Sequence, residues 1–244
     1  MKEQLAYFKS IFEGDFHFNK LHQYLYATDA SVYRKLPLAV AFPKSSTGIK
    51  QLIDFATKHH TSLIPRAAGT SLAGQCVGDG IIVDVSKYFT KIISVDKENK
   101  TIKLQPGVIR DELNDYLKPF GLFFGPNTST SNRCMIGGMV GNNSSGTTSI
   151  QYGVTRDKVL TLKTILSNGD EAIFTSLNKE TFEEKKKLNS LEGTIYKSIY
   201  KELKSEDAQL EINDNFPKSE IHRRNTGYAI DELIKTQVFS DSED

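Results

Sequence analysis

The sequence contains few cysteines and has no excess of charge of either sign. Only Cys76 and Cys134 are cysteines among 244 residues, and they form no Cys-x-x-Cys motif. Two isolated cysteines cannot build a zinc or iron–sulfur site by themselves, and they argue against a disulfide framework. The 31 basic and 30 acidic residues leave a net charge of +1, which gives no electrostatic basis for binding nucleic acid or an anionic membrane. We therefore expect a small-molecule ligand, no metal and a reducing, cytoplasmic environment.

Several common sequence signatures are also missing. No apolar run approaches the roughly 20 residues that cross a bilayer, and the first residues are too polar for a secretory signal peptide. We expect no membrane span. Neither a G-x-G-x-x-G motif that opens a helix nor a G-x-x-x-x-G-K-[ST] motif occurs, which excludes the Rossmann and P-loop nucleotide sites.

The hydrophobic pattern alternates between strands and helices. Residues 1–12 have helical spacing and read as a helical lead-in, whereas residues 27–33 are polar and small and read as a loop. Buried strands are predicted at 38–43, 62–64 and 81–85, and Ser45-Ser46-Thr47 can cap a helix that ends near residue 60. Further predictions are hairpins at 92–105 and 159–174 and helices at 109–120, 179–187 and 191–203. The pattern is α+β.

A loop of small residues follows the strand at 62–64. It reads Pro65-Arg66-Ala67-Ala68-Gly69-Thr70-Ser71-Leu72-Ala73-Gly74-Gln75. Glycine permits the positive φ angles that turn successive N–H groups inward, so this loop suits a phosphate or pyrophosphate. Thr70 and Ser71 would add hydroxyl donors, and Arg66 a positive charge. Taken alone, a surface turn between two strands explains the same residues.

A second region of small and polar residues runs from Phe124 to Gly146. A loop of this length inside a compact domain is usually functional or disordered, and Ile136, Met139 and Val140 in its middle favour function. Its hydroxyls, amides and glycines suit a large polar cofactor better than acid–base catalysis. Asn142 and Asn143 can equally serve as caps of turns.

Together the two regions resemble the FAD-linked oxidases related to vanillyl-alcohol oxidase and to D-lactate and D-2-hydroxyglutarate dehydrogenases. Residues 65–74 resemble the P-R-x-x-G-T-S-x-x-G pyrophosphate loop of that family. Cys134-Met135-Ile136-Gly137-Gly138, Asn143-Ser144-Ser145-Gly146 and Tyr152-Gly153 resemble its second flavin loop. Ala27-Thr28-Asp29-Ala30-Ser31-Val32-Tyr33 resembles a segment found near the start of the same group, especially in its large members fused to iron–sulfur domains.

The resemblance implies a PCMH-type FAD-binding fold of two α+β subdomains that clasp the cofactor. We expect a lead-in at 1–35, a first subdomain at 36–106 and a second at 107–244 that is incomplete at its C-terminus. Relatives continue with a G-[ST]-E-G-T-L-G segment and a substrate-binding domain, and Leu191-Glu192-Gly193-Thr194 matches that motif only weakly and too early. The chain is therefore expected to be the N-terminal piece of a longer enzyme.

The resemblance also assigns cofactor contacts. Those to the pyrophosphate are Arg66, Ala67, Ala68, Gly69, Thr70, Ser71, Gly74 and Gln75, and those to the ribityl chain and flavin are Pro126, Ser129, Gly137, Gly138, Asn143 and Gly146. Some relatives carry a histidine in the first loop that bonds covalently to the flavin. This chain has none there, so non-covalent FAD is expected, and whether the chain alone retains it is left open.

A basic stretch near the C-terminus is the remaining candidate. Arg223 and Arg224 stand in His222-Arg223-Arg224-Asn225-Thr226-Gly227-Tyr228, which resembles an R-x-[ST]-G-Y segment of the family. Arginines there can bind a substrate carboxylate or the reduced flavin. An exposed basic loop is the equal alternative.

The implied function is oxidation of a D-2-hydroxy acid by hydride transfer to FAD. No catalytic base is assigned, because Asp84, His59 and His222 have simpler structural explanations. The implied partners are the 2-hydroxy acid and, as electron acceptor, an iron–sulfur domain of the same longer chain. A cytoplasmic location is expected, with peripheral membrane attachment of the longer protein left open. The alternatives are a non-catalytic nucleotide-binding module and an electron-transfer flavoprotein.

Overall fold

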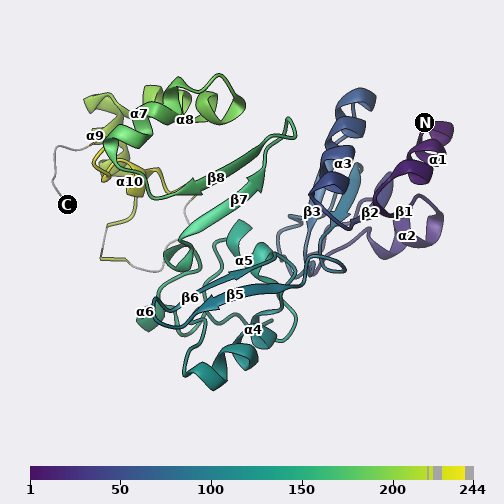
Figure 1. The fold of residues 1–244 in the computed structure, drawn as a ribbon, viewed down its shortest axis with the longest axis horizontal. Coiled ribbons are helices and arrows are strands. Elements are labelled where there is room, and N and C mark those ends of the chain that lie inside the picture. The colour runs from purple at the N-terminus through teal and green to yellow at the C-terminus, as the bar shows by residue number, and fades with distance from the viewer. Residues whose placement is uncertain (219, 222–226, 240–244) are drawn as a thin grey trace. The chain divides into compact units, whose positions relative to one another are not determined.

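The computed structural model describes residues 1–218, 220–221 and 227–239 (Figure 1). The chain divides into two compact units, Met1–Asp157 and Lys158–Asp244. The boundary between the two units falls between residues 157 and 158. The predicted boundaries at 35/36 and 106/107 concern smaller subdomains and remain a prediction. In the described part of the chain, no helix is both long and apolar enough to cross a membrane.

The first unit is built from short strands interleaved with helices. Its elements are α1 (Lys2–Ile11), β1 (Gly14–His17), α2 (Lys20–Leu25), β2 (Ala39–Pro43), α3 (Ser46–His59), β3 (Leu63–Arg66), β4 (Ile81–Asp84), β5 (Ile92–Asp96), β6 (Thr101–Leu104), α4 (Arg110–Leu117), η1 (Lys118–Phe120), α5 (Ile136–Gly141), α6 (Ser149–Tyr152) and η2 (Arg156–Lys158), which ends at the start of the second unit.

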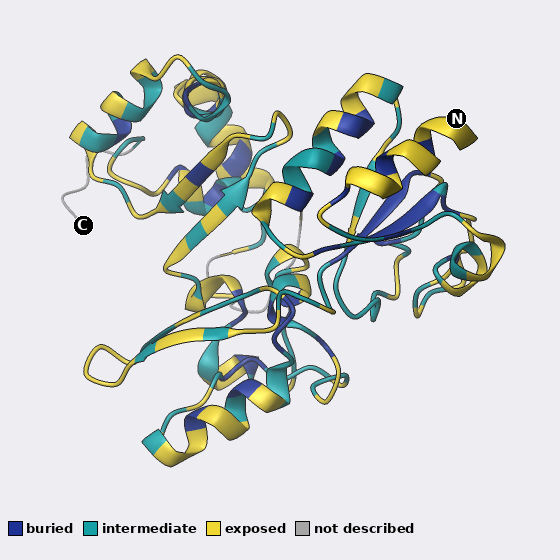
Figure 2. Ribbon diagram, turned by 45° about the vertical axis from the view of Figure 1, so that its right-hand side comes forward, coloured by how far each residue is buried: buried dark blue, intermediate teal, exposed yellow. Residues whose placement is uncertain are grey.

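Four of these strands form one sheet in the order β1-β2-β4-β3. β2 and β3 both run parallel to β4, and β1 runs antiparallel to β2. All four residues of β4 are buried, as expected for a strand covered on both faces (Figure 2). The predicted Ser45 cap is confirmed, because its side chain accepts a hydrogen bond from the Gly48 N–H at the start of α3.

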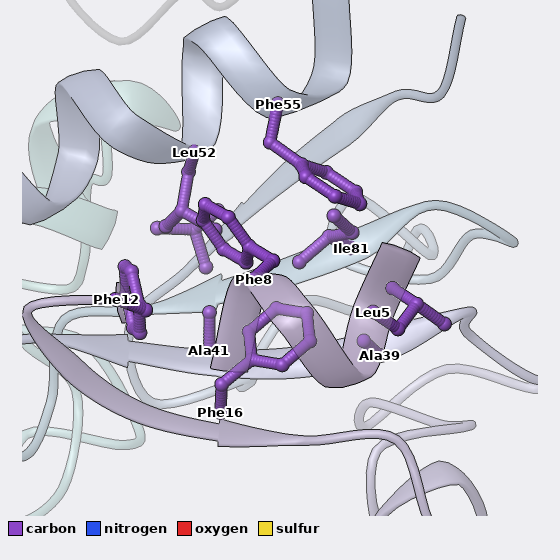
Figure 3. Close-up of a cluster of buried hydrophobic side chains, with 10 residues drawn as sticks. Leu5, Phe8, Phe12, Phe16, Ala39, Ala41, Leu52, Phe55 and Ile81 are labelled. Atoms are coloured by element: carbon purple, nitrogen blue, oxygen red, sulfur yellow. The ribbon is translucent and has the colours of Figure 1, made fainter. Parts of the chain in front are cut away.

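Aromatic side chains from the N-terminal segment fill the core against this sheet (Figure 3). Phe8 on α1 packs against Phe55 on α3 with ring centroids 4.5 Å apart, and Phe16 on β1 meets Phe8 edge to face. The core of the first sheet therefore includes four side chains of the N-terminal segment, Leu5, Phe8, Phe12 and Phe16. Strand β1 was not predicted, because Gly14 and Asp15 are weak strand formers whose pairing comes from the neighbouring β2.

A second layer of the first unit contains the predicted hairpin and helix. β5 and β6 pair antiparallel, as predicted, and α4 covers most of the helix expected at 109–120. The buried residues of this layer include Leu113 and Leu117 on α4, and Met139 on α5. The region 124–146, expected to be a loop, contains the short helix α5.

Close backbone contacts fix the rest of that region. The Thr148 hydroxyl donates a hydrogen bond to the Gly125 carbonyl over 2.8 Å. Gly146 lies so near the Asn127 carbonyl oxygen that a Cβ atom at residue 146 would overlap it. The absence of a side chain at Gly146 is therefore a packing requirement of the chain path.

The second unit combines a hairpin with helices. Its elements are β7 (Thr161–Ile165), β8 (Glu171–Thr175), α7 (Lys179–Lys187), α8 (Leu191–Leu203), α9 (Glu206–Asn215) and α10 (Ile230–Leu233). The predicted hairpin and the helices at 179–187 and 191–203 are confirmed. Phe182 on α7 packs edge to face on Tyr196 of α8, with ring centroids 5.4 Å apart.

His17 is expected to make folding depend on pH. Its ring stacks on His22 at 3.8 Å between centroids, and burial, followed by the charges of His22 and Lys9, lowers its pKa from 6.5, although Asp15 opposes this. Protonation is therefore easier in the unfolded chain. The stabilising contribution is complete above pH 6.5 and is lost as the pH falls through the folded pKa.

The NMR titration of His17 should give a pKa below 6.5, which rises in His22→Gln. Lowering the pH from about 7.5 to about 5.5 should lower the thermal midpoint of the unmodified chain. The same change of pH should lower the thermal midpoint of His17→Gln by less. A His17 titration at or above its ordinary value would contradict this account.

Gly146→Ala should destabilise the first unit by about 2–3 kcal/mol, because the added methyl group forces the Asn127 backbone to move. Gly141→Ala is the matched control, since a Cβ at Gly141 meets no described atom within 4 Å. Denaturant titration of both variants checks the difference. Equal stability of the two variants would show that the backbone around residue 146 can move to accept a methyl group without lowering the free energy of unfolding.

Candidate functional site

The first loop leaves the sheet at the end of β3 and runs through residues 67–75. Gly69 and Gly74 have φ angles of 67° and 70°, which side chains disfavour. The Ser71 hydroxyl oxygen accepts hydrogen bonds from the N–H groups of Ala73 at 3.1 Å and Gln75 at 3.3 Å. Ser71 therefore shapes the turn, in addition to any contact that it makes with a ligand.

The N–H groups of residues 67–72 are the main chemical feature of this loop. None of these six donates a hydrogen bond to any other group in the part of the chain that the structure describes. The side chain of Leu72 is 81% exposed, so it does not cover them. A run of unpaired N–H groups around small residues offers donors to an anion such as a phosphate.

The Tyr26–Tyr33 segment packs against the first loop. The Ala30 N–H donates to the Gly69 carbonyl at 3.2 Å, and the Tyr33 ring comes within 2.8 Å of where a Cβ would stand on Gly74. The Cys76 thiol lies 3.6 Å from the Asp29 carboxylate. Burial raises the pKa of the Cys76 thiol, so this cysteine is a packing residue and not a nucleophile.

Arg66 stands at the base of the loop. Its Nη1 donates to the Thr28 carbonyl at 2.8 Å, and its guanidinium carbon lies 5.0 Å from the centre of the Tyr26 ring. A Cβ atom on Gly69 would overlap the Arg66 guanidinium. The Tyr26–Tyr33 segment therefore holds the arginine side chain beside Gly69.

The two loops predicted to bind one cofactor lie next to each other in the first unit. The Gln75 Nε2 donates to the Asn142 Oδ1 at 3.1 Å, and the Asn142 Nδ2 donates to the Ser144 hydroxyl at 3.1 Å. A Cβ on Gly138 would stand 3.5 Å from that of Ala67. The structure thus brings the predicted residues Ala67, Gln75 and Gly138 together. It adds Asn142, which was not among the predicted contacts.

The other predicted contacts of the second region have visible packing roles. The Gly137 N–H donates to the Pro106 carbonyl at 2.8 Å, and Gly137 has no room for a Cβ beside Pro106. Pro126 is fully buried. The Asn143 Oδ1 accepts the Arg156 N–H at 2.9 Å, and Ser129 is exposed. Their cofactor contacts, and that of Gly146, stay predictions.

Arg223 and Arg224, the predicted substrate residues, lie outside the residues that the structure describes. Asp84 is buried and accepts hydrogen bonds from the Tyr26 hydroxyl at 2.7 Å and from the Ser86 N–H at 2.7 Å. These bonds agree with its expected structural role.

The first unit therefore offers a binding site. Free backbone donors, small side chains and a second loop directly beside them suit an extended ligand that carries a diphosphate. FAD is a cofactor of this kind, and the residues present fit it.

Comparison with known proteins supports this fit. The family of FAD binding domains matches residues 37–174, which is more than half of the chain. The D-2-hydroxyglutarate dehydrogenase of Escherichia coli is 39% identical over 230 residues, which cover 93% of this chain and 22% of that protein. The mitochondrial cytochrome-linked D-lactate dehydrogenase of Kluyveromyces lactis is 32% identical over 54% of this chain and 23% of its own length.

Solved structures share the fold. An alkyldihydroxyacetonephosphate synthase superposes with a TM-score of 0.63 at 20% identity, covering 73% of this chain and 35% of that one. The predicted α+β FAD-binding fold is confirmed. The chain spans about a fifth of the length of the two dehydrogenases named above. With the family match covering both loops and the strands that carry them, the chain belongs to the FAD binding domain family.

Proposed function

We propose that this chain is the FAD-binding part of a dehydrogenase that oxidises a D-2-hydroxy acid. The observation that carries the proposal is the contact between the two loops, with six free N–H groups on the first of them. Of the two candidate substrates, we favour D-2-hydroxyglutarate. The similarity to the D-2-hydroxyglutarate dehydrogenase covers 93% of the chain, whereas the similarity to the D-lactate dehydrogenase covers 54%.

The first loop would hold the pyrophosphate of FAD. Its small side chains leave the backbone open, and the hydroxyl of Thr70 adds a donor. Ser129, Gly138 and Asn143 would lie along the ribityl chain and the flavin. Binding would be non-covalent, since residues 65–75 contain no histidine.

FAD, when bound, supplies the acceptor for the two electrons that leave the substrate as a hydride. The part of this chain is to bind the cofactor and orient it, with Gln75 and Asn142 joining the two loops at one end. Arg223 and Arg224 are proposed to meet a substrate carboxylate. The proton acceptor is not assigned to any residue of this chain.

The visible spectrum of the purified protein tests the proposal. We expect bound yellow flavin that D-2-hydroxyglutarate bleaches in the absence of oxygen. The chain and the polypeptide that its whole gene encodes should be measured side by side. Bound flavin that no 2-hydroxy acid bleaches would favour a non-catalytic module or an electron-transfer flavoprotein. A full-length protein that remains colourless with added FAD would exclude a flavoprotein.

A matched pair of glycine variants on α5 tests the place of the cofactor. Gly138→Leu should weaken FAD binding by at least about 10-fold, because its side chain enters the space beside Ala67 where the loops meet. Gly141→Leu alters the same helix one turn later, where no described atom lies within 4 Å of a Cβ. Titration with FAD should find nearly unchanged affinity there. Equal affinity of the two variants would argue against a cofactor between these loops.

A further inference from the structure

Tyr26 lies between a buried carboxylate and the arginine of the first loop. Its hydroxyl donates a hydrogen bond to the Asp84 Oδ2 at 2.7 Å, and its ring centre lies 5.0 Å from the guanidinium carbon of Arg66. The second Asp84 oxygen accepts the Ser86 N–H at 2.7 Å. Tyr26 thus contacts the Asp84 carboxylate through its hydroxyl and the Arg66 guanidinium through its ring.

The sheet determines which residues meet here. Arg66 on β3 pairs with Asp84 on β4, so the two side chains leave the same face of adjacent parallel strands. Asp84 is only 3% exposed, and a buried carboxylate is tolerated only when donors satisfy it. Burial, followed by the hydrogen bond to Asp84, raises the pKa of Tyr26, which keeps its hydroxyl protonated as a donor.

The Arg66 side chain connects Tyr26 and Asp84 to the first loop. Its Nη1 donates to the Thr28 carbonyl at 2.8 Å, and its guanidinium lies against Gly69, where a Cβ atom would overlap it. The turn at Gly69 lies in the middle of the run of free N–H groups at 67–72. A displaced guanidinium would therefore let this turn, and the donors on both sides of it, change position.

We infer that Tyr26 and Asp84 are positioning residues of the cofactor site, which act through Arg66 to hold the first loop in the shape that receives the pyrophosphate of FAD. This inference rests on the proposed function. Neither residue needs to touch the cofactor. The effect of Tyr26 on FAD binding therefore depends on the presence of Arg66, whereas a purely structural effect on the sheet does not.

A double-mutant cycle on FAD affinity tests this dependence. Tyr26→Leu, Arg66→Gln and the double variant are titrated with FAD in the full chain, and the thermal midpoint of each ligand-free variant is recorded. Tyr24→Leu is the matched control, because the Tyr24 ring carries Arg34 at 5.7 Å in a similar stack and is 55% exposed. Tyr26→Phe keeps the ring and repeats the test if Tyr26→Leu does not fold.

Tyr26→Leu should raise the Kd for FAD by about 5- to 10-fold with Arg66 present and by less than about 2-fold in Arg66→Gln. Tyr26→Phe should show the same dependence with a smaller effect, and Tyr24→Leu should leave the Kd unchanged. An effect of Tyr26 variants that is equal with and without Arg66, or equal to that of Tyr24→Leu, overturns the inference alone. An unmodified full-length protein that binds no FAD overturns the proposed function, and this inference with it.

Discussion

Strand β3 leaves the sheet at Arg66, directly opposite Asp84 on β4, and the parallel pairing of these strands fixes where the first loop begins. Both strands are short, so their position depends on the buried core that Phe8, Phe16 and Leu52 build on the sheet. A shift of the β3–β4 register would separate Arg66 from the Tyr26 and Asp84 pair. The geometry of the candidate site is thus set within the sheet.

The second region is positioned differently. Gly137 and Gly146 sit against backbone atoms of Pro106 and Asn127, where a side chain has no room, and these close approaches fix the path of the chain between α4 and η2. The family resemblance predicted that both glycines contact the cofactor. Their packing roles account for the absence of side chains whether or not they also touch a cofactor, so the glycine pattern of the region serves the fold as well as the site.

Much of the fold could be predicted because its signals are local. The helix α3 has a capping serine and a regular apolar face, and the hairpins have polar turns between alternating residues. Strand β1 and helices α9 and α10 were not predicted. β1 has a weak strand sequence and depends on β2, whereas α9 carries a local signal that was missed, a capping serine at Ser205. α10 is only four residues long, and Ile230 in it packs with Leu203 and Ile212 of the preceding helices. The direction of individual side chains could not be predicted either. Sequence alone cannot tell that Asn142 meets Gln75 while the neighbouring Asn143 accepts the Arg156 N–H.

The six N–H groups of the first loop also bear on how such a protein changes over evolutionary time. Because these donors belong to the main chain, exchanges among small residues at Ala67, Ala68 or Thr70 leave the same groups in place. Gly69 is constrained differently, because its φ angle of 67° and the nearby Arg66 guanidinium both disfavour a side chain there. Tolerance to substitution should therefore differ from residue to residue along the loop, with Gly69 as the position where a side chain is least acceptable.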